Sequence, residues 1–136
     1  MYLDNMNAQH KEIHELVKEI QKWKFTADVE THAEELTKNV AKLAGVLSVH
    51  LAAEDKYLYP SLMKSEDATV RECAKRFADD MGDLSKDFNA YKSTYNTAGK
   101  IKGESHKFVA DTSVIIGALL NRLQKEDMEL YPLVKD

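Results

Sequence analysis

The sequence contains few of the residues that interrupt helices or form covalent cross-links. It has two prolines, five glycines and one cysteine among 136 residues. The single cysteine, Cys73, excludes an internal disulfide framework and is typical of a reducing compartment. The sequence also lacks an apolar run of the roughly 18 residues that a membrane span needs, and it lacks a signal-peptide core. We therefore expect a cytoplasmic protein that does not enter a membrane.

An excess of one charge is also absent. The formal net charge is −4 and the two signs are interspersed along the chain, which argues against a nucleic-acid-binding surface. Apolar residues make up 43% and charged residues 31%, as in ordinary globular proteins. A chain of this length can bury a core without covalent cross-links. We expect one domain that covers residues 1–136.

Apolar residues recur every three or four positions in four blocks, the pattern of helices that pack in a bundle. The blocks cover residues 3–20, 36–61, 70–95 and 108–130. Short joints at 26–29, 64–67 and 98–103 require neighbouring helices to be antiparallel. The sequence therefore predicts an all-α fold, an up-down-up-down antiparallel four-helix bundle. Three residues are predicted to cap helices, namely Thr31 in a capping box with Glu34, Asp67, and Ser105.

One segment occurs twice, since residues 50–60 return as residues 122–132. The copies share a Leu, then Glu-Asp, then Leu-Tyr-Pro, but His50 of the first copy is Arg122 in the second. His50 and Glu54 are four residues apart, so they lie on one helix face about 6 Å apart along the axis. Such a pair can bind a metal if the face is buried. A guanidinium cannot.

Polar residues occupy positions of the helical pattern that should be apolar, namely His10, His50, Glu54, Arg122 and Glu126. They lie at a similar depth, and Met81 occupies the matching layer of the third block. An unpaired buried charge costs several kcal/mol, on the order of the penalty known for broken buried ion pairs, so these residues need partners. The partners are each other, a metal, or both. A lone histidine here is usually a hydrogen-bonded core residue, but two histidines and two carboxylates from three helices favour a metal site.

The motifs resemble the hemerythrin-like, or HHE cation-binding, domains over essentially the full length. The resemblance is carried by His10-Lys-Glu-Ile13, by the His50…Glu54-Asp-x-x-Leu-Tyr-Pro60 segment, and by its second copy ending at Pro132. It implies a centre of two irons bridged by carboxylates, in proteins that carry oxygen, sense iron or oxygen, or respond to nitrosative and peroxide stress. It also implies the ligands His10, His50, Glu54 and Glu126.

Two ligands that the family uses are missing from this sequence. Met81 and Arg122 stand where the resemblance expects histidines. A thioether is a weak donor for a hard ferric ion, and Arg122 stays protonated. We expect Arg122 to fork onto Glu54 or Glu126 in place of a second cation. The prediction is a degenerate, mononuclear site that holds one iron ion, or another divalent metal, instead of a complete di-iron centre. His14, one turn after His10, is an extra ligand or a contact to the ligands, or else a partly exposed flank residue.

Two kinds of function follow. The first is metal binding in sensing, storage or stress response, with a metal ion and O2 or NO as partners. The alternative is a metal-free regulatory or interaction bundle held by an Arg122–Glu54/Glu126 network. No catalytic triad, phosphate loop or paired-cysteine motif occurs, so the sequence marks no catalytic residue and an enzyme is not the favoured reading. It identifies no protein partner.

Overall fold

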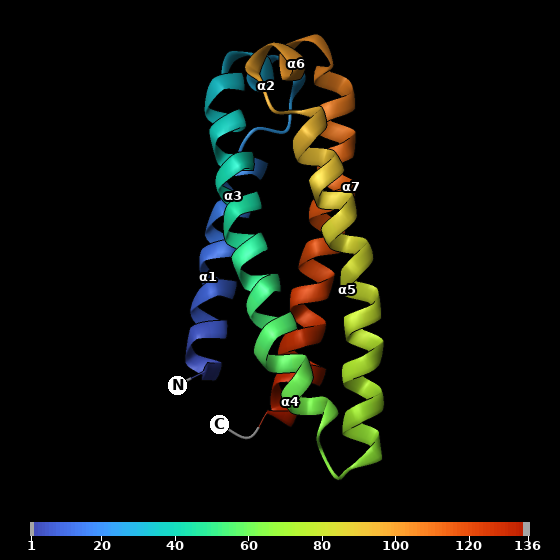
Figure 1. Cartoon of the computed structure of the whole chain (residues 1–136). Coiled ribbons are helices and arrows are strands. Elements are labelled where there is room, and N and C mark those ends of the chain that lie inside the picture. The colour runs from blue at the N-terminus through green and yellow to red at the C-terminus, as the bar shows by residue number, and fades with distance from the viewer. Residues whose placement is uncertain (1, 135–136) are drawn as a thin grey trace.

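The structure, a computed structural model, describes residues 2–134 apart from the side chains of residues 81 and 82. Its body consists of four long helices, α1 (Tyr2–Gln21), α3 (Ala33–Ala53), α5 (Ala68–Thr94) and α7 (Ser105–Lys125). Figure 1 shows them side by side and running in alternate directions, and each contacts the next around the bundle, with α7 returning to α1. The predicted all-α fold is confirmed, and residues 2–134 contain no strand.

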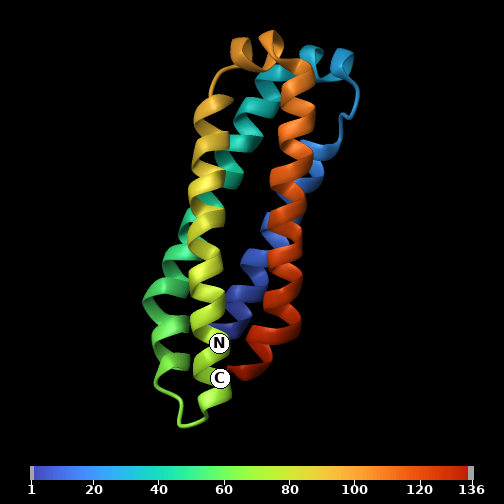
Figure 2. The same ribbon diagram turned by 90° about the vertical axis from the view of Figure 1, so that its right-hand side faces the viewer.

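Each end of the bundle is covered by short elements. The helices α2 (Thr26–Thr31) and α6 (Ala98–Gly103) contact each other across one end. The other end carries both chain termini and α4 (Tyr59–Met63), as the two views in Figures 1 and 2 show. The sequence predicted non-helical joints at 26–29 and 98–103, and this was wrong. Val29 and Ile101 are fully buried, so each segment folds into a helical turn that covers the end of the core.

The predicted helix caps have different outcomes. Asp67 caps α5 as predicted, because its side chain accepts a hydrogen bond from the N–H two residues later at 2.9 Å. Thr31 lies inside the unpredicted α2, where its hydroxyl donates to the carbonyl four residues earlier instead of capping α3. Ser105 is already the first residue of α7, and its hydroxyl donates to Glu30 at 3.1 Å. It therefore ties α7 to α2.

The helices α3 and α7 each continue into one π-helical turn, η1 (Glu54–Leu58) and η2 (Glu126–Leu130). The turn η1 leads into α4, and η2 leads into the 3₁₀ turn η3 (Tyr131–Leu133). A tyrosine and then a proline follow each π turn. In a regular α-helix a proline would lack the N–H for its hydrogen bond and would collide with the carbonyl four residues earlier. The wider turn bonds the N–H of each tyrosine to the carbonyl of the glutamate five residues earlier. Both glutamates, which end the preceding α-helices, and both tyrosines are buried.

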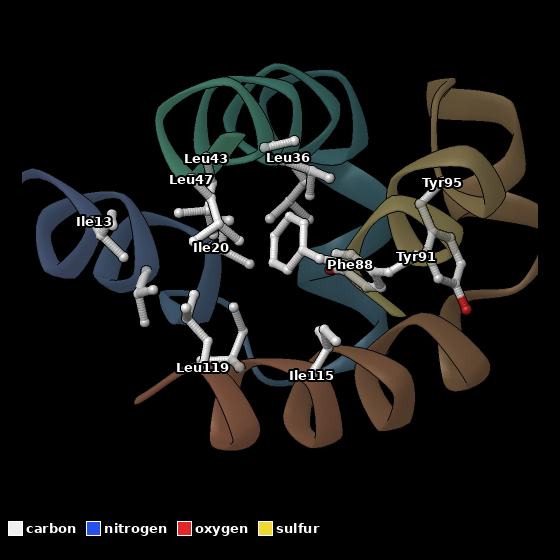
Figure 3. Packing of buried hydrophobic residues seen from close by; sticks show 14 of the residues in the cluster. Ile13, Ile20, Leu36, Leu43, Leu47, Phe88, Tyr91, Tyr95, Ile115 and Leu119 are labelled. Atoms are coloured by element: carbon white, nitrogen blue, oxygen red, sulfur yellow. The ribbon is translucent and has the colours of Figure 1, made fainter. Parts of the chain in front are cut away.

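The core is divided into two apolar clusters. The larger cluster fills the bundle from its middle to the end covered by α2 and α6, and Figure 3 shows side chains such as Ile20, Leu43 and Leu119 meeting there. The smaller cluster lies near the chain termini and includes Met6, Phe77 and Leu130, among others. None of the helices in the described part of the chain is long and apolar enough to cross a bilayer.

Candidate metal centre

A layer of buried polar residues separates the two apolar clusters. The buried carboxylates mark the boundary on two elements, since Glu54 and Glu126 each stand between a leucine of the larger cluster and a leucine of the smaller one. On α1, His10 likewise follows Met6 and precedes Ile13. The residues of the layer are no more than 7% exposed; they are His10, His50, Glu54, Arg122 and Glu126. The common depth that the sequence predicted for them is what the structure shows.

The donor atoms of three of these residues converge on one point. Nε2 of His10 lies 3.1 Å from Nε2 of His50 and 3.1 Å from Oε1 of Glu126. Nε2 of His50 lies 3.5 Å from the same glutamate oxygen. One donor atom from each residue falls within 4.8 Å of the other two, so this group could hold a metal ion. The ligand roles predicted for these residues stay a proposal.

Each histidine uses its other ring nitrogen to contact an oxygen outside the group. Nδ1 of His10 donates to Oδ1 of Asp127 at 3.0 Å, and Nδ1 of His50 donates to Oε1 of Gln9 at 2.7 Å. A carboxylate oxygen and an amide oxygen only accept hydrogen bonds, so both Nδ1 atoms carry hydrogen. A neutral ring then presents the lone pair of Nε2 to the centre. This is the arrangement by which outer contacts orient imidazole ligands.

Two lone pairs and a carboxylate oxygen repel one another at these distances unless positive charge lies between them. A proton on an Nε2 atom supplies such charge, and so does a metal ion. Burial alone would raise the pKa of Glu126. The hydrogen bonds from His10 and His50 outweigh burial and lower the pKa of Glu126. The centre therefore favours a cation.

Glu54 lies beside this group with its carboxyl group unsatisfied. Its Oε1 is 3.3 Å from Nε2 of His50, yet neither of its oxygens has a hydrogen-bond partner, and Oε2 of Glu126 has none either. Burial raises the pKa of Glu54, and the negative charge of Glu126 acts in the same direction. Unpaired buried oxygens are rare because each costs about 1–3 kcal/mol. A metal ion would give these oxygens the partner that they lack, so the residues present fit the group that the sequence predicted.

The predicted fork of Arg122 onto a carboxylate is wrong. The guanidinium donates instead to the carbonyl oxygen of Phe77 on α5, stacks over the Phe77 ring at 4.5 Å, and lies 3.9 Å from a carboxylate oxygen of Asp80. Both carboxylate oxygens of Glu54 lack a hydrogen-bond partner, so Arg122 donates no hydrogen bond to Glu54. The planar guanidinium contacts an aromatic ring and a carbonyl oxygen instead of a carboxylate. Its charge acts on Glu54 without a hydrogen bond and opposes the rise in the pKa of Glu54.

The two remaining sequence predictions concern Met81 and His14. The side chain of Met81 lies outside the described residues, so its predicted place in the layer stays a prediction. His14 is exposed and does not belong to the group of converging donors. It lines a surface hollow of about 580 Å³, whose wall also includes His10, Asp127 and Tyr131. This hollow brings solvent to the edge of the buried layer.

Sequence reasoning missed three residues that contact the histidines. They are Gln9, Asp127 and Tyr131, whose hydroxyl oxygen lies 2.8 Å from Nε2 of His10. Asp127 and Tyr131 belong to the repeated segment, and their recurrence beside Glu126 was a signal that could have found them. Gln9 gave no signal, because a polar residue at the edge of a helix face is usually solvated.

The whole chain was compared with known proteins. The family model described as the hemerythrin HHE cation-binding domain matches residues 1–134. No curated protein and no solved structure matches the chain. The match covers the converging histidines and both copies of the repeated segment, in agreement with the resemblance drawn from those motifs. The chain therefore belongs to the hemerythrin HHE cation-binding domain family.

Proposed function

We propose that this bundle binds a single iron ion through His10, His50 and Glu126, with Glu54 as a further carboxylate donor. The observation that carries the proposal is the convergence of two Nε2 atoms and a carboxylate oxygen in a buried layer, with both Nδ1 atoms already engaged. Two imidazoles and one carboxylate with open positions are the donor set of mononuclear non-haem ferrous iron. Family membership supports a cation at this place.

Arg122 supports one ion instead of two. It stands one helical turn before Glu126, at the position that His50 holds relative to Glu54 in the first copy. Arg122 is only 7% exposed, and its fixed positive charge lies close enough to Glu54 to oppose the rise in the pKa of that carboxyl group. A second cation in that half of the layer would be repelled by this charge and would lack an imidazole from α7.

A role in sensing fits this site better than a role in storage. One ion in a chain of 136 residues is a small capacity for a store. The ion would instead join α1, α3 and η2, so its presence changes how one end of the bundle is held together. The hollow beside His10 gives small molecules such as O2 or NO a route to the edge of the layer.

The direct test is to load the protein with ferrous iron under anaerobic conditions, remove unbound metal, and measure the iron content. We expect about one ion per chain, and much less in His50→Ala. The matched control is His106→Ala, because His106 is exposed and distant in sequence from the donors. A stoichiometry near zero that His50→Ala leaves unchanged would contradict the proposal. Competition with manganese and zinc in the same assay identifies the preferred metal.

A gain of metal tests the assignment of a single ion. The double variant Met81→His with Arg122→His removes the guanidinium and adds the two imidazoles that the family pattern expects. We expect its iron content to rise from about one toward two per chain. An iron content equal to that of the parent would show that these positions do not limit the stoichiometry.

A further inference from the structure

Tyr131 lies closer to the donor atoms of the layer than a packing role requires. It is the first residue of η3, directly after the π turn η2, and its side chain is buried. Its hydroxyl oxygen lies 2.8 Å from Nε2 of His10 and 3.4 Å from Nε2 of His50. The oxygen therefore faces the same two nitrogen atoms as the carboxylate of Glu126, from the side of the hollow that Tyr131 helps to line.

The repeated segment supplies a second tyrosine in a different setting. Tyr59 occupies the place of Tyr131 in the first copy and is equally buried, but its hydroxyl has no hydrogen-bond partner. Burial raises the pKa of Tyr59, the charges of Glu54 and Glu126 add to this effect, and the charge of Arg122 opposes it. Tyr59 is thus a buried tyrosine of the same motif that does not bond to either histidine.

We propose that Tyr131 is a ligand of the bound iron in its ferric state, through the phenolate oxygen. The inference rests on the proposed function, because it concerns the same ion. A phenolate is a hard, anionic oxygen donor of the kind that ferric iron accepts, and tyrosine serves as an iron ligand in other proteins. When the iron–oxygen bond forms, the O–H bond of Tyr131 breaks and its proton leaves to solvent through the adjoining hollow. Iron is not reduced or oxidised in this step.

A ferric ion bound to phenolate absorbs visible light by charge transfer, which histidine and carboxylate ligands do not provide. The protein is loaded with ferrous iron, oxidised with stoichiometric ferricyanide and desalted, and its iron content and visible spectrum are recorded. We expect a visible band in the wild-type protein, its loss in Tyr131→Phe, and its retention in Tyr59→Phe. Iron should remain bound in Tyr131→Phe, because His10, His50 and Glu126 are intact.

The outcomes separate the inference from the proposed function. A band that persists in Tyr131→Phe, or wild-type protein that holds ferric iron without a band, overturns the inference and leaves the iron site standing. Wild-type protein that takes up no iron overturns both. Circular dichroism checks that each variant is folded. If Tyr131→Phe does not fold, Tyr131→His serves in its place, since it retains a metal donor and should bind iron without the band.

Discussion

Arg122 is held by α5 and not by the carboxylates of the layer. Its guanidinium lies over the Phe77 ring and donates to the Phe77 carbonyl, while the carboxylate of Asp80, which lies 3.9 Å away, is 64% exposed. Contact with Asp80 is therefore weak, because water screens it. We expect Arg122 to stabilise the fold through the contact with the buried ring and the bond to the carbonyl, and its charge would repel a second cation bound beside it.

Truncation of Arg122 tests this reading. We expect Arg122→Ala to lower the free energy of unfolding by about 1.5–3 kcal/mol, the range for a hydrogen bond to a charged group. Urea unfolding followed by circular dichroism provides the measurement. The control is Arg76→Ala, since Arg76 is exposed on the same helix that Arg122 contacts and should change stability by no more than about 0.5 kcal/mol. Equal stability of the two variants would show that the stack contributes nothing.

Asp127 acts on the site through His10. Its carboxylate accepts from Nδ1 of His10 at 3.0 Å, although its side chain is 44% exposed. Loss of such a contact typically weakens metal binding by about 10- to 100-fold. We expect a loss of that size in Asp127→Ala, measured by competition with a chelator of known affinity.

The first copy of the repeat offers the control for that measurement. Asp55 follows Glu54 as Asp127 follows Glu126, yet Asp55 is exposed. We expect Asp55→Ala to leave the iron affinity unchanged. If the two alanine variants weakened binding equally, the contact between Asp127 and His10 would not explain the loss.

The π turns determine which side chains of the repeated segment reach the centre. In each copy the turn carries one residue more between bonded groups than an α-helical turn does. Glu126 already points inward at the end of α7, as the helical pattern predicts, and the extra residue brings Tyr131 inward just after η2 ends. The π turn, more than any single contact in it, sets the position of Tyr131.

Insertion of one residue into η2 should therefore disrupt the site. Met128 lies in the middle of η2 and is 69% exposed, so its side chain is dispensable. We expect insertion of one alanine after Met128 to place Tyr131 six residues after Glu126, rotate Tyr131 by about 100° away from the centre, and abolish the visible band of the ferric protein. The substitution Met128→Ala keeps the spacing and should retain the band. An insertion variant with an unchanged spectrum would show that η2 does not position Tyr131.

At the scale of the whole molecule, buried tyrosines are distributed along the bundle. Burial is the main cause that raises the pKa of Tyr91 and Tyr95 on α5, and it does the same for Tyr59 and Tyr131 near the termini. The unfolded chain ionises these phenols near pH 10, while the folded chain keeps them neutral. Their contribution to stability is fully present below pH 10 and is lost as the pH rises further.

We expect the free energy of unfolding to fall steeply above pH 10. The tyrosinate absorbance of the buried tyrosines should appear together with the loss of helical circular dichroism, since these phenols become accessible only on unfolding. Tyr91→Phe should make the fall shallower, because one raised pKa is removed. Tyr57→Phe is the control, since Tyr57 is 55% exposed. Tyrosinate absorbance beyond that of the exposed Tyr57 in a fully helical protein would contradict the prediction.

The helical periodicity was enough to predict the bundle and the depth of the polar layer, because buried and exposed positions follow directly from it. It was not enough to predict α2 and α6, because each of these helices is too short for its buried residues to form a recognisable helical pattern. It also could not show the direction of the Arg122 side chain, which depends on an aromatic face supplied by another helix. Tyr131 was visible in the repeat, but a π turn was needed to bring it to the histidines.

The division of the core by charged residues has a consequence for cooperativity. The smaller apolar cluster near the termini is cut off from the larger one, so that end of the bundle can open on its own while the rest stays folded. A cation shared by His10 and Glu126, which are 116 residues apart in sequence, would hold this end shut. The backbone amides at this end should then exchange with solvent faster in the protein without iron than in the iron-loaded protein, because the bound cation would prevent local opening.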